Sequence, residues 1–265
     1  MNQSNQVDIS VLKRMVTKNI NPLSVENLGE TVKILQTGQV SMQGQVVHGS
    51  NYTFLVSVTR ENKTLQAIYK PIMGEQPLWD FPIHTLAHRE IAAFIVSTLL
   101  KWHFVPPTVM NQSGPYGRGS LQLFIHHNPQ IHYMNNNEIS PEIIQKIALF
   151  DFIINNADRK AGHVLMDQNK KIWLIDHGVC FHTEKKLRTV IWEYADQQIP
   201  AILLKDIQIF VHTVKSNQHK LTQKINHLLN QNEKRAMLRR AQYLLLKPFF
   251  PAPEQNRRSY PWPPI

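Results

Sequence analysis

The most constraining feature of this chain is the segment 149–182, LFDFIINNADRKAGHVLMDQNKKIWLIDHGVCFH, which carries two aspartates at the edges of apolar runs. The runs HVLM and KIWLI are mostly apolar and flank the polar turn DQNK, a pattern that predicts a short β-hairpin. Asp158 precedes this hairpin and Asp176 ends it, so the hairpin should bring the two carboxylates to one site. Two such carboxylates can serve as a general base and as a ligand for a hard cation.

The same segment resembles the catalytic motifs of kinases. D-R-K-A-G-H is similar to the catalytic loop D-x-K-x-x-N, and I-D-H-G is similar to the D-F-G that follows the next strand. Other strings, among them YKP, GEQPLWDFP and VPPTV, resemble an uncharacterised bacterial family related to the phosphatidylinositol 3-/4-kinases and HipA-like kinases. The alternative is a purely structural hairpin with two exposed aspartates.

This resemblance implies an α+β, two-lobed protein-kinase-like fold. An N-terminal antiparallel β-rich lobe should bind the nucleotide and a C-terminal helical lobe should carry the catalytic loop. We expect these lobes at residues 1–127 and 128–247, followed by a proline-rich tail at 248–265.

Composition sets broad limits on the class of protein. A length of 265 residues with 42% hydrophobic and 18% charged residues suits a globular protein with a substantial core. The single cysteine, Cys180, excludes an internal disulfide. The polar N-terminus lacks a signal-peptide pattern, and the run IAAFIVSTLL is too short to cross a membrane. We therefore expect a cytoplasmic protein without an integral membrane segment.

The net charge of +10 is compatible with anionic partners or with an ordinary solvated surface. The basic residues concentrate late in the chain rather than around the two aspartates. We expect no nucleic-acid partner, although the charge is compatible with one.

In the N-terminal part, apolar spacing predicts a helix over residues 8–17 and β-strands over 31–39, 45–58 and 64–70. Between the first two strands, where kinases place a glycine-rich loop over the phosphates, the chain has no G-x-G-x-x-G. The tight turn formed by Gly49, Ser50 and Asn51 is our candidate for the phosphate-covering loop. A plain β-turn is the alternative.

Lys70 ends the third predicted strand, where the resemblance places the kinase lysine that contacts the ATP phosphates. Glu90, in the apolar helix predicted over residues 84–102, is its candidate ion-pair partner. The alternative for Glu90 is a favourable interaction with the positive end of the helix dipole.

The rest of the chain reads as two further strands, a linker and a series of helices. The strands are predicted at 104–110 and 119–125, and the linker, which in kinases binds adenine through backbone groups, at 126–138. Ser140 and Pro141 mark the start of a helix that delivers the catalytic loop. Further helices are predicted over residues 199–214, 219–230 and 233–246, and the tail from residue 247 should lack regular structure.

The resemblance assigns a role to each residue of the loop. Asp158 would accept the proton of the acceptor hydroxyl, Lys160 would stabilise the transferred phosphoryl group, and Asp176 would bind Mg²⁺ or Mn²⁺. His163 stands where kinases have a metal-binding asparagine. An imidazole ligand favours manganese over magnesium, but His163 could instead brace the loop.

Three classes of function are therefore open. The first is an ATP-dependent phosphotransferase whose hydroxyl acceptor is a protein, a lipid or a small molecule. The second is a nucleotide-binding pseudokinase or regulatory module, favoured by His163 and by the missing glycine pattern. The third is a metal-dependent hydrolase built on four residues, which are His163, Asp176, His177 and His182.

Overall fold

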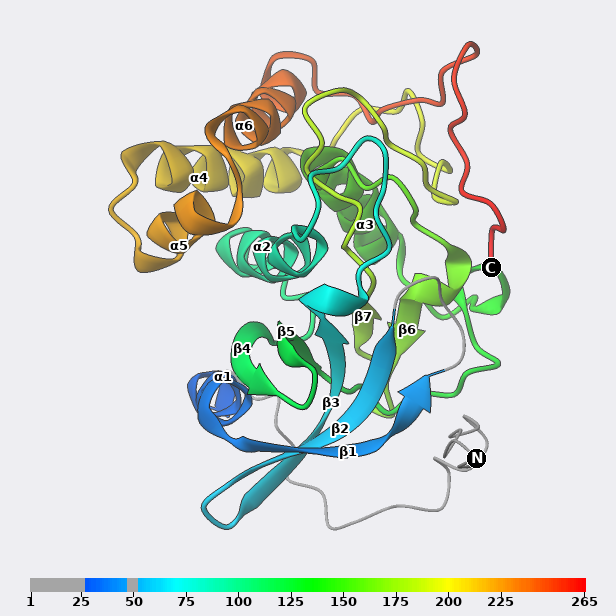
Figure 1. Cartoon of the computed structure of the whole chain (residues 1–265). Helices are drawn as coiled ribbons and strands as arrows, with labels where there is room; N and C mark the ends of the chain where they lie inside the picture. Colours follow the sequence, from blue (N-terminus) through cyan, green and yellow to red (C-terminus); the bar gives the residue numbers. More distant parts are fainter. Residues whose placement is uncertain (1–26, 47–51) are drawn as a thin grey trace. The chain divides into compact units, whose positions relative to one another are not determined.

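The computed structural model describes residues 27–46 and 52–265, and the helix predicted over 8–17 lies outside these ranges. The described chain forms an α+β protein that divides into two compact units, one built on strands and one mainly on helices (Figure 1). The first compact unit comprises the described residues up to Ile91 together with Pro106–Phe124. The second comprises Ala92–Val105 and Ile125–Ile265.

The first unit is built on an antiparallel sheet with the order β1-β2-β3-β5-β4. Its strands are β1 (Gln39–Val46), β2 (Thr53–Arg60), β3 (Lys63–Pro71), β4 (Thr108–Gly114) and β5 (Gly117–Leu123). A tight turn joins β2 to β3, with Arg60 opposite Lys63, and β3 confirms the strand predicted over residues 64–70. The two strands predicted after the long helix are confirmed as β4 and β5.

The strand predicted over residues 31–39 is wrong. Residues 28–37 form helix α1 (Leu28–Thr37), which packs against β4, and the first strand begins only at Gln39. Thr31, Ile34 and Leu35 are buried at helical spacing on one face. Burial of that face outweighs the preference of Thr, Val and Ile for strands, because most helix stability in proteins comes from packing of an apolar face.

Helix α2 (Leu86–Leu99) follows a loop that contains the short 3₁₀ turn η3 (Ile72–Gly74). Glu75, from the start of this loop, accepts hydrogen bonds from the backbone N–H groups of Leu86 and Ala87 at 3.2 and 2.9 Å. The first N–H groups of a helix have no acceptor within the helix, and a carboxylate at this position supplies one. Its negative charge also interacts favourably with the positive end of the helix dipole. The loop therefore fixes the start of α2.

In the second unit, helix α3 (Pro141–Ile154) leads into the loop with the two aspartates. The predicted cap is confirmed, because the Ser140 side chain accepts a hydrogen bond from the N–H of Ile143. The predicted hairpin is also confirmed as strands β6 (Val164–Met166) and β7 (Ile172–Leu174), which pair with each other.

Helices α4 (Ala201–Ser216), α5 (Lys220–Leu228) and α6 (Gln231–Leu246) confirm the predicted helices of the C-terminal part (Figure 1). Helix α6 packs on α3, α4 and α5, so it ties the helices of this unit together. After α6 the chain has no regular helix or strand up to Ile265, as predicted.

A helix that crosses a bilayer must be both long and apolar, and this requirement can be applied to the described helices. None of them is both long enough and apolar enough to cross a bilayer.

Candidate functional site

The first unit contains the ion pair that the kinase resemblance implies. Lys70, near the end of β3, places its Nζ 2.6 Å from Oε1 of Glu90 in α2. The Glu90 side chain is only 4% exposed, whereas that of Lys70 is 25% exposed. A lysine held in this way by a buried carboxylate keeps its ammonium in a defined place while part of it stays accessible.

Gly119 allows β5 to approach the backbone of Lys70. A Cβ atom at this position would lie 2.4 Å from the carbonyl oxygen of Lys70 and 2.7 Å from Cα of Pro71. Such contacts are closer than real Cβ atoms make, so a larger residue at 119 would displace the strand end that carries Lys70. The other candidates in this part of the chain, Gly49, Ser50 and Asn51, lie outside the described residues.

In the second unit, the loop that carries Asp158 begins at two asparagines, Asn155 and Asn156, which follow helix α3. Asn155 adopts left-handed backbone angles, with φ 54°, and donates its Nδ2 to the carbonyl groups of His182 and Glu184 at 2.9 and 2.6 Å. Asn156 accepts, through Oδ1, the N–H of Asp158 at 3.0 Å. These amides bend the chain out of the helix and fix the backbone of Asp158.

A buried ion pair holds this loop to helix α3. The guanidinium of Arg159 donates to the Asp151 carboxylate through Nε at 2.9 Å and through Nη2 at 3.0 Å, and both side chains are fully buried. Its Nη1 donates to the carbonyl of Ile175 at 3.0 Å, and Nη2 lies 2.8 Å from Nε2 of His177. Arg159 therefore connects the backbone next to Asp158 with the backbone next to Asp176.

Neither Asp151 nor Arg159 was among the residues predicted from the sequence to form the site. A signal was present, because Asp151 interrupts the apolar run LFDFII, and a charge in a buried helix needs a partner. The partner lies outside the helix, so helical spacing alone could not identify it.

Asp158 lies beside a cation and near a second carboxylate. Nζ of Lys160 is 3.4 Å from Oδ2 of Asp158. Burial raises the pKa of Asp158, the charge of Asp176 raises it further, and the charges of Lys160 and Arg188 oppose this rise. A carboxyl whose pKa is raised above its ordinary value is a better proton acceptor than an exposed aspartate.

Asp176 has left-handed backbone angles, with φ 62°, and its side chain is half exposed. Its Oδ2 lies 3.5 Å from Nε2 of His163. Backbone of this kind is sparsely populated for residues other than glycine and is often found at functional sites. The geometry presents one carboxylate and one imidazole at the end of the hairpin.

These donors fit a divalent cation that is bound together with a nucleotide. Magnesium needs only one or two protein carboxylates, because phosphate oxygens and water complete its coordination shell. Among residues 27–46 and 52–265, no three His, Cys, Asp or Glu side chains lie close enough to hold a metal ion by themselves. In the alternative role, His163 accepts through Nδ1 a weak hydrogen bond from the N–H of Lys160, at 3.5 Å.

The residues of the hydrolase hypothesis do not gather into one metal site. His177 is buried against Arg159, and Nδ1 of His182 accepts the N–H of Glu184 at 3.0 Å. His163 and Asp176 do face each other, with Nε2 and Oδ2 3.5 Å apart.

Comparison with protein families gives one match that covers most of the chain. The family model described as "Phosphatidylinositol 3- and 4-kinase" matches residues 5–232. Protein Rv2133c of Mycobacterium tuberculosis is 34% identical over 87% of this chain and 94% of its own length. Phosphatidylinositol 4-kinase gamma 4 of Oryza sativa subsp. japonica is 27% identical over 67% of this chain, which corresponds to only 37% of the rice protein.

Solved structures of low sequence identity share the fold. A crystal structure of the Golgi casein kinase matches with a TM-score of 0.56 and 15% identity, covering 84% of this chain and 74% of that one. A second structure of that kinase, with Mn/ADP bound, has a TM-score of 0.55 and 15% identity, over 92% and 81% of the two chains.

Proposed function

Because the chain belongs to the phosphatidylinositol 3- and 4-kinase family, we propose that it transfers the γ-phosphoryl group of ATP to a hydroxyl group. The acceptor is a hydroxyl-bearing protein, lipid or small molecule, and the family name alone does not select among these. In this proposal residues 1–127 bind the nucleotide, and residues 128–247 carry the catalytic loop.

The arrangement around Asp158 is the observation that supports this proposal best. One buried network, centred on Arg159 and Asp151, supports the backbone beside both Asp158 and Asp176. Phosphoryl transfer needs mainly positioning and charge neutralisation from a protein, and a rigidly supported pair of carboxylates provides the first of these.

Asp158 accepts the proton of the acceptor hydroxyl as the oxygen attacks the γ-phosphorus. The new O–P bond forms while the bond between the γ-phosphorus and the bridging oxygen breaks, and ADP leaves with that electron pair. Lys160, which lies 3.4 Å from Asp158, stabilises charge on the transferred group. Each of these two residues thus acts on a different oxygen of the reacting centre.

Lys70 neutralises the phosphates of the nucleotide, and Glu90 holds the lysine in place. Gly49, Ser50 and Asn51 are the proposed phosphate-covering turn. Asp176 is the proposed ligand of Mg²⁺ or Mn²⁺, and His163 is the proposed second ligand. When bound, the cation neutralises charge on the phosphates. The manganese and ADP in the similar Golgi casein kinase support this choice of cofactors.

A nucleotide-binding pseudokinase is the second candidate. The contact between Nδ1 of His163 and the backbone N–H of Lys160 favours it, because a ring that braces the loop is not available as a metal ligand. Such a protein would bind ATP without transferring phosphate.

Incubation with γ-labelled ATP, with and without Mg²⁺ or Mn²⁺, separates the two candidates. Label transferred to an added hydroxyl acceptor or to the protein itself, and lost in Asp158→Asn, would support the phosphotransferase. Binding of ATP without any transfer would support the pseudokinase. Absence of both binding and transfer in the folded protein would refute the proposal.

A further inference from the structure

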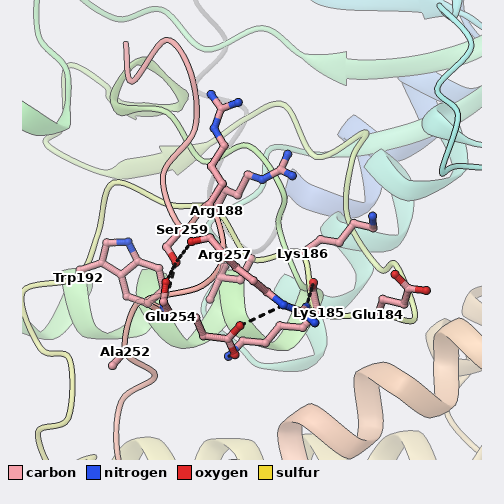
Figure 2. Close-up of a pocket in the computed structure, with 11 residues that line it drawn as sticks. Glu184, Lys185, Lys186, Arg188, Trp192, Ala252, Glu254, Arg257 and Ser259 are labelled. Atoms are coloured by element: carbon pink, nitrogen blue, oxygen red, sulfur yellow. Dashed lines mark hydrogen bonds and ion pairs between the residues drawn. The ribbon is translucent and has the colours of Figure 1, made fainter.

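A basic cavity of about 270 Å³ lies in the second unit, between the segment that follows His182 and the C-terminal tail (Figure 2). Five basic side chains and two acidic ones line it. Two basic residues come from the tail and three from the earlier segment: Arg257 and Arg258, and Lys185, Lys186 and Arg188.

The acidic residues do not balance this charge. Glu254 forms an ion pair with Lys185 and lies 3.4 Å from Nε of Arg257, so two cations share one carboxylate. Glu184 is the other acidic residue of the lining. The pKa of Glu254 is lowered by its hydrogen bond to Lys185, as expected in positive surroundings. The cavity therefore carries an excess of positive charge, which an anion would offset.

The wall formed by residues 184–188 is hydrogen-bonded to the loop that carries Asp158. The N–H of Arg188 donates to the carbonyl of Asn156, and the carbonyl of Arg188 accepts the N–H of Arg159, both at 2.9 Å. The backbone of Arg188 is thus hydrogen-bonded to residues on both sides of Asp158 in the sequence.

The tail is hydrogen-bonded to the segment after His182 and, beyond the cavity lining, to the loop that carries Asp158. The carbonyl of Ser259 accepts the N–H of Thr189 at 3.1 Å, and the carbonyl of Pro264 accepts the N–H of Ala161 at 2.8 Å. Ala161 follows Lys160, so a shift of the tail would move the backbone next to the proposed catalytic residues.

We propose that this cavity is a binding site for a small phosphate-bearing anion. The anion bridges the tail to residues 185–188 and thereby stabilises the conformation of the loop around Asp158. Arginine guanidinium groups recognise phosphate oxygens with paired N–H donors, and lysines add charge to the same site. The lining includes none of the residues proposed to bind the nucleotide. Its tail wall lies beyond residue 232, where the family match ends, so family membership does not account for it.

The first measurement is calorimetric titration of the full chain with inorganic phosphate in the absence of ATP. The double variant Lys186→Gln/Arg258→Gln removes one cation from each wall and should weaken phosphate binding by about tenfold or more, since charge-assisted contacts are the strong ones. Arg235→Gln, which removes an exposed arginine of α6 outside the cavity lining, is the matched control and should bind as the unmodified chain does.

A second arm distinguishes free from lipid-borne phosphate, using phosphatidylcholine vesicles with and without phosphatidic acid. Binding of inorganic phosphate supports the proposed free anion, and binding only to phosphatidic acid vesicles assigns the site to a lipid headgroup; in both cases the double variant must lose it. Binding of neither, or equal binding by the double variant, overturns the site.

Hydrogen exchange tests the proposed bridge. Phosphate should slow exchange of the amide protons of Ala161 and Thr189 in the unmodified chain, and this protection should be lost in the double variant. Phosphate binding with unchanged exchange at both amides would refute the bridge. None of these measurements needs phosphoryl transfer, so the site and the proposed function can fail independently.

Discussion

Replacing Arg159 by methionine tests the buried network beneath the proposed catalytic loop. The variant keeps most of the side-chain volume but leaves the Asp151 carboxylate, which is fully buried, without its guanidinium partner. The variant loses every hydrogen bond from Arg159 to this carboxylate, whereas the one that Nδ2 of Asn156 donates to Oδ1, at 3.0 Å, remains. Breaking a buried ion pair by removing one partner costs about 3–5 kcal/mol, and we expect the unfolding free energy of the second unit to fall by this amount.

Two further variants separate this effect from ordinary loss of a charge. Lys146→Met breaks the ion pair with Glu142 on the outer face of the same helix, where both partners are partly exposed, and should cost less than about 1 kcal/mol. The double variant Asp151→Leu/Arg159→Met removes both charges, so it should be more stable than Arg159→Met alone.

Urea unfolding, followed by circular dichroism and by tryptophan fluorescence, gives the free energies for this comparison. A loss below about 1 kcal/mol in Arg159→Met, comparable to that in Lys146→Met, would refute the idea that this pair holds the loop. A double variant less stable than the single one would show that the orphaned charge is not the cause.

Four further predictions concern the proposed site. Asp176→Ala should abolish metal-dependent ATP binding in a folded protein, and unchanged affinity by calorimetry would remove Asp176 from the site. Asp158→Asn should retain ATP binding while transfer falls by about 10²–10⁴, and equal turnover would make Asp158 structural. His163→Asn should shift the metal preference from manganese towards magnesium, whereas an unchanged activity ratio would mean that His163 only braces the loop. Arg188→Gln removes a cation that lowers the pKa of Asp158, opposing burial and Asp176, so that pKa should rise and the acid limb of the pH profile of kcat/KM should move to higher pH; the same limb in both proteins, with Lys160 intact, would contradict this coupling.

Local signals in the sequence were sufficient to predict several elements. Ser140 and Pro141 identified the start of α3, because an N-cap and a first-turn proline act within one turn of the helix. The β6–β7 hairpin followed from apolar runs that flank a polar turn. The kinase-like fold was implied by the resemblance of D-R-K-A-G-H and I-D-H-G to kinase motifs, and the solved structures that share the fold confirm it.

Residues 28–37 show where local signals failed. The β-branched residues of TVKIL favour a strand, but the helix buries Thr31, Ile34 and Leu35 on one face. Which of the two periodicities is used depends on the surface against which the segment packs, here β4. The sequence of the segment does not contain that surface.

The tertiary structure alone decided which distant groups meet. It paired Arg159 with Asp151, placed Glu75 at the first amides of α2, and brought the carbonyl of Pro264 to the N–H of Ala161. The sequence determined which residues could carry charge, end a helix or accept a proton, because these properties belong to single side chains and their nearest neighbours. The partner of a buried charge, or of a backbone N–H group that has no acceptor in its own helix or strand, depends on how the whole chain packs. The desolvation of such a group must be offset by whichever group the fold brings within hydrogen-bonding distance.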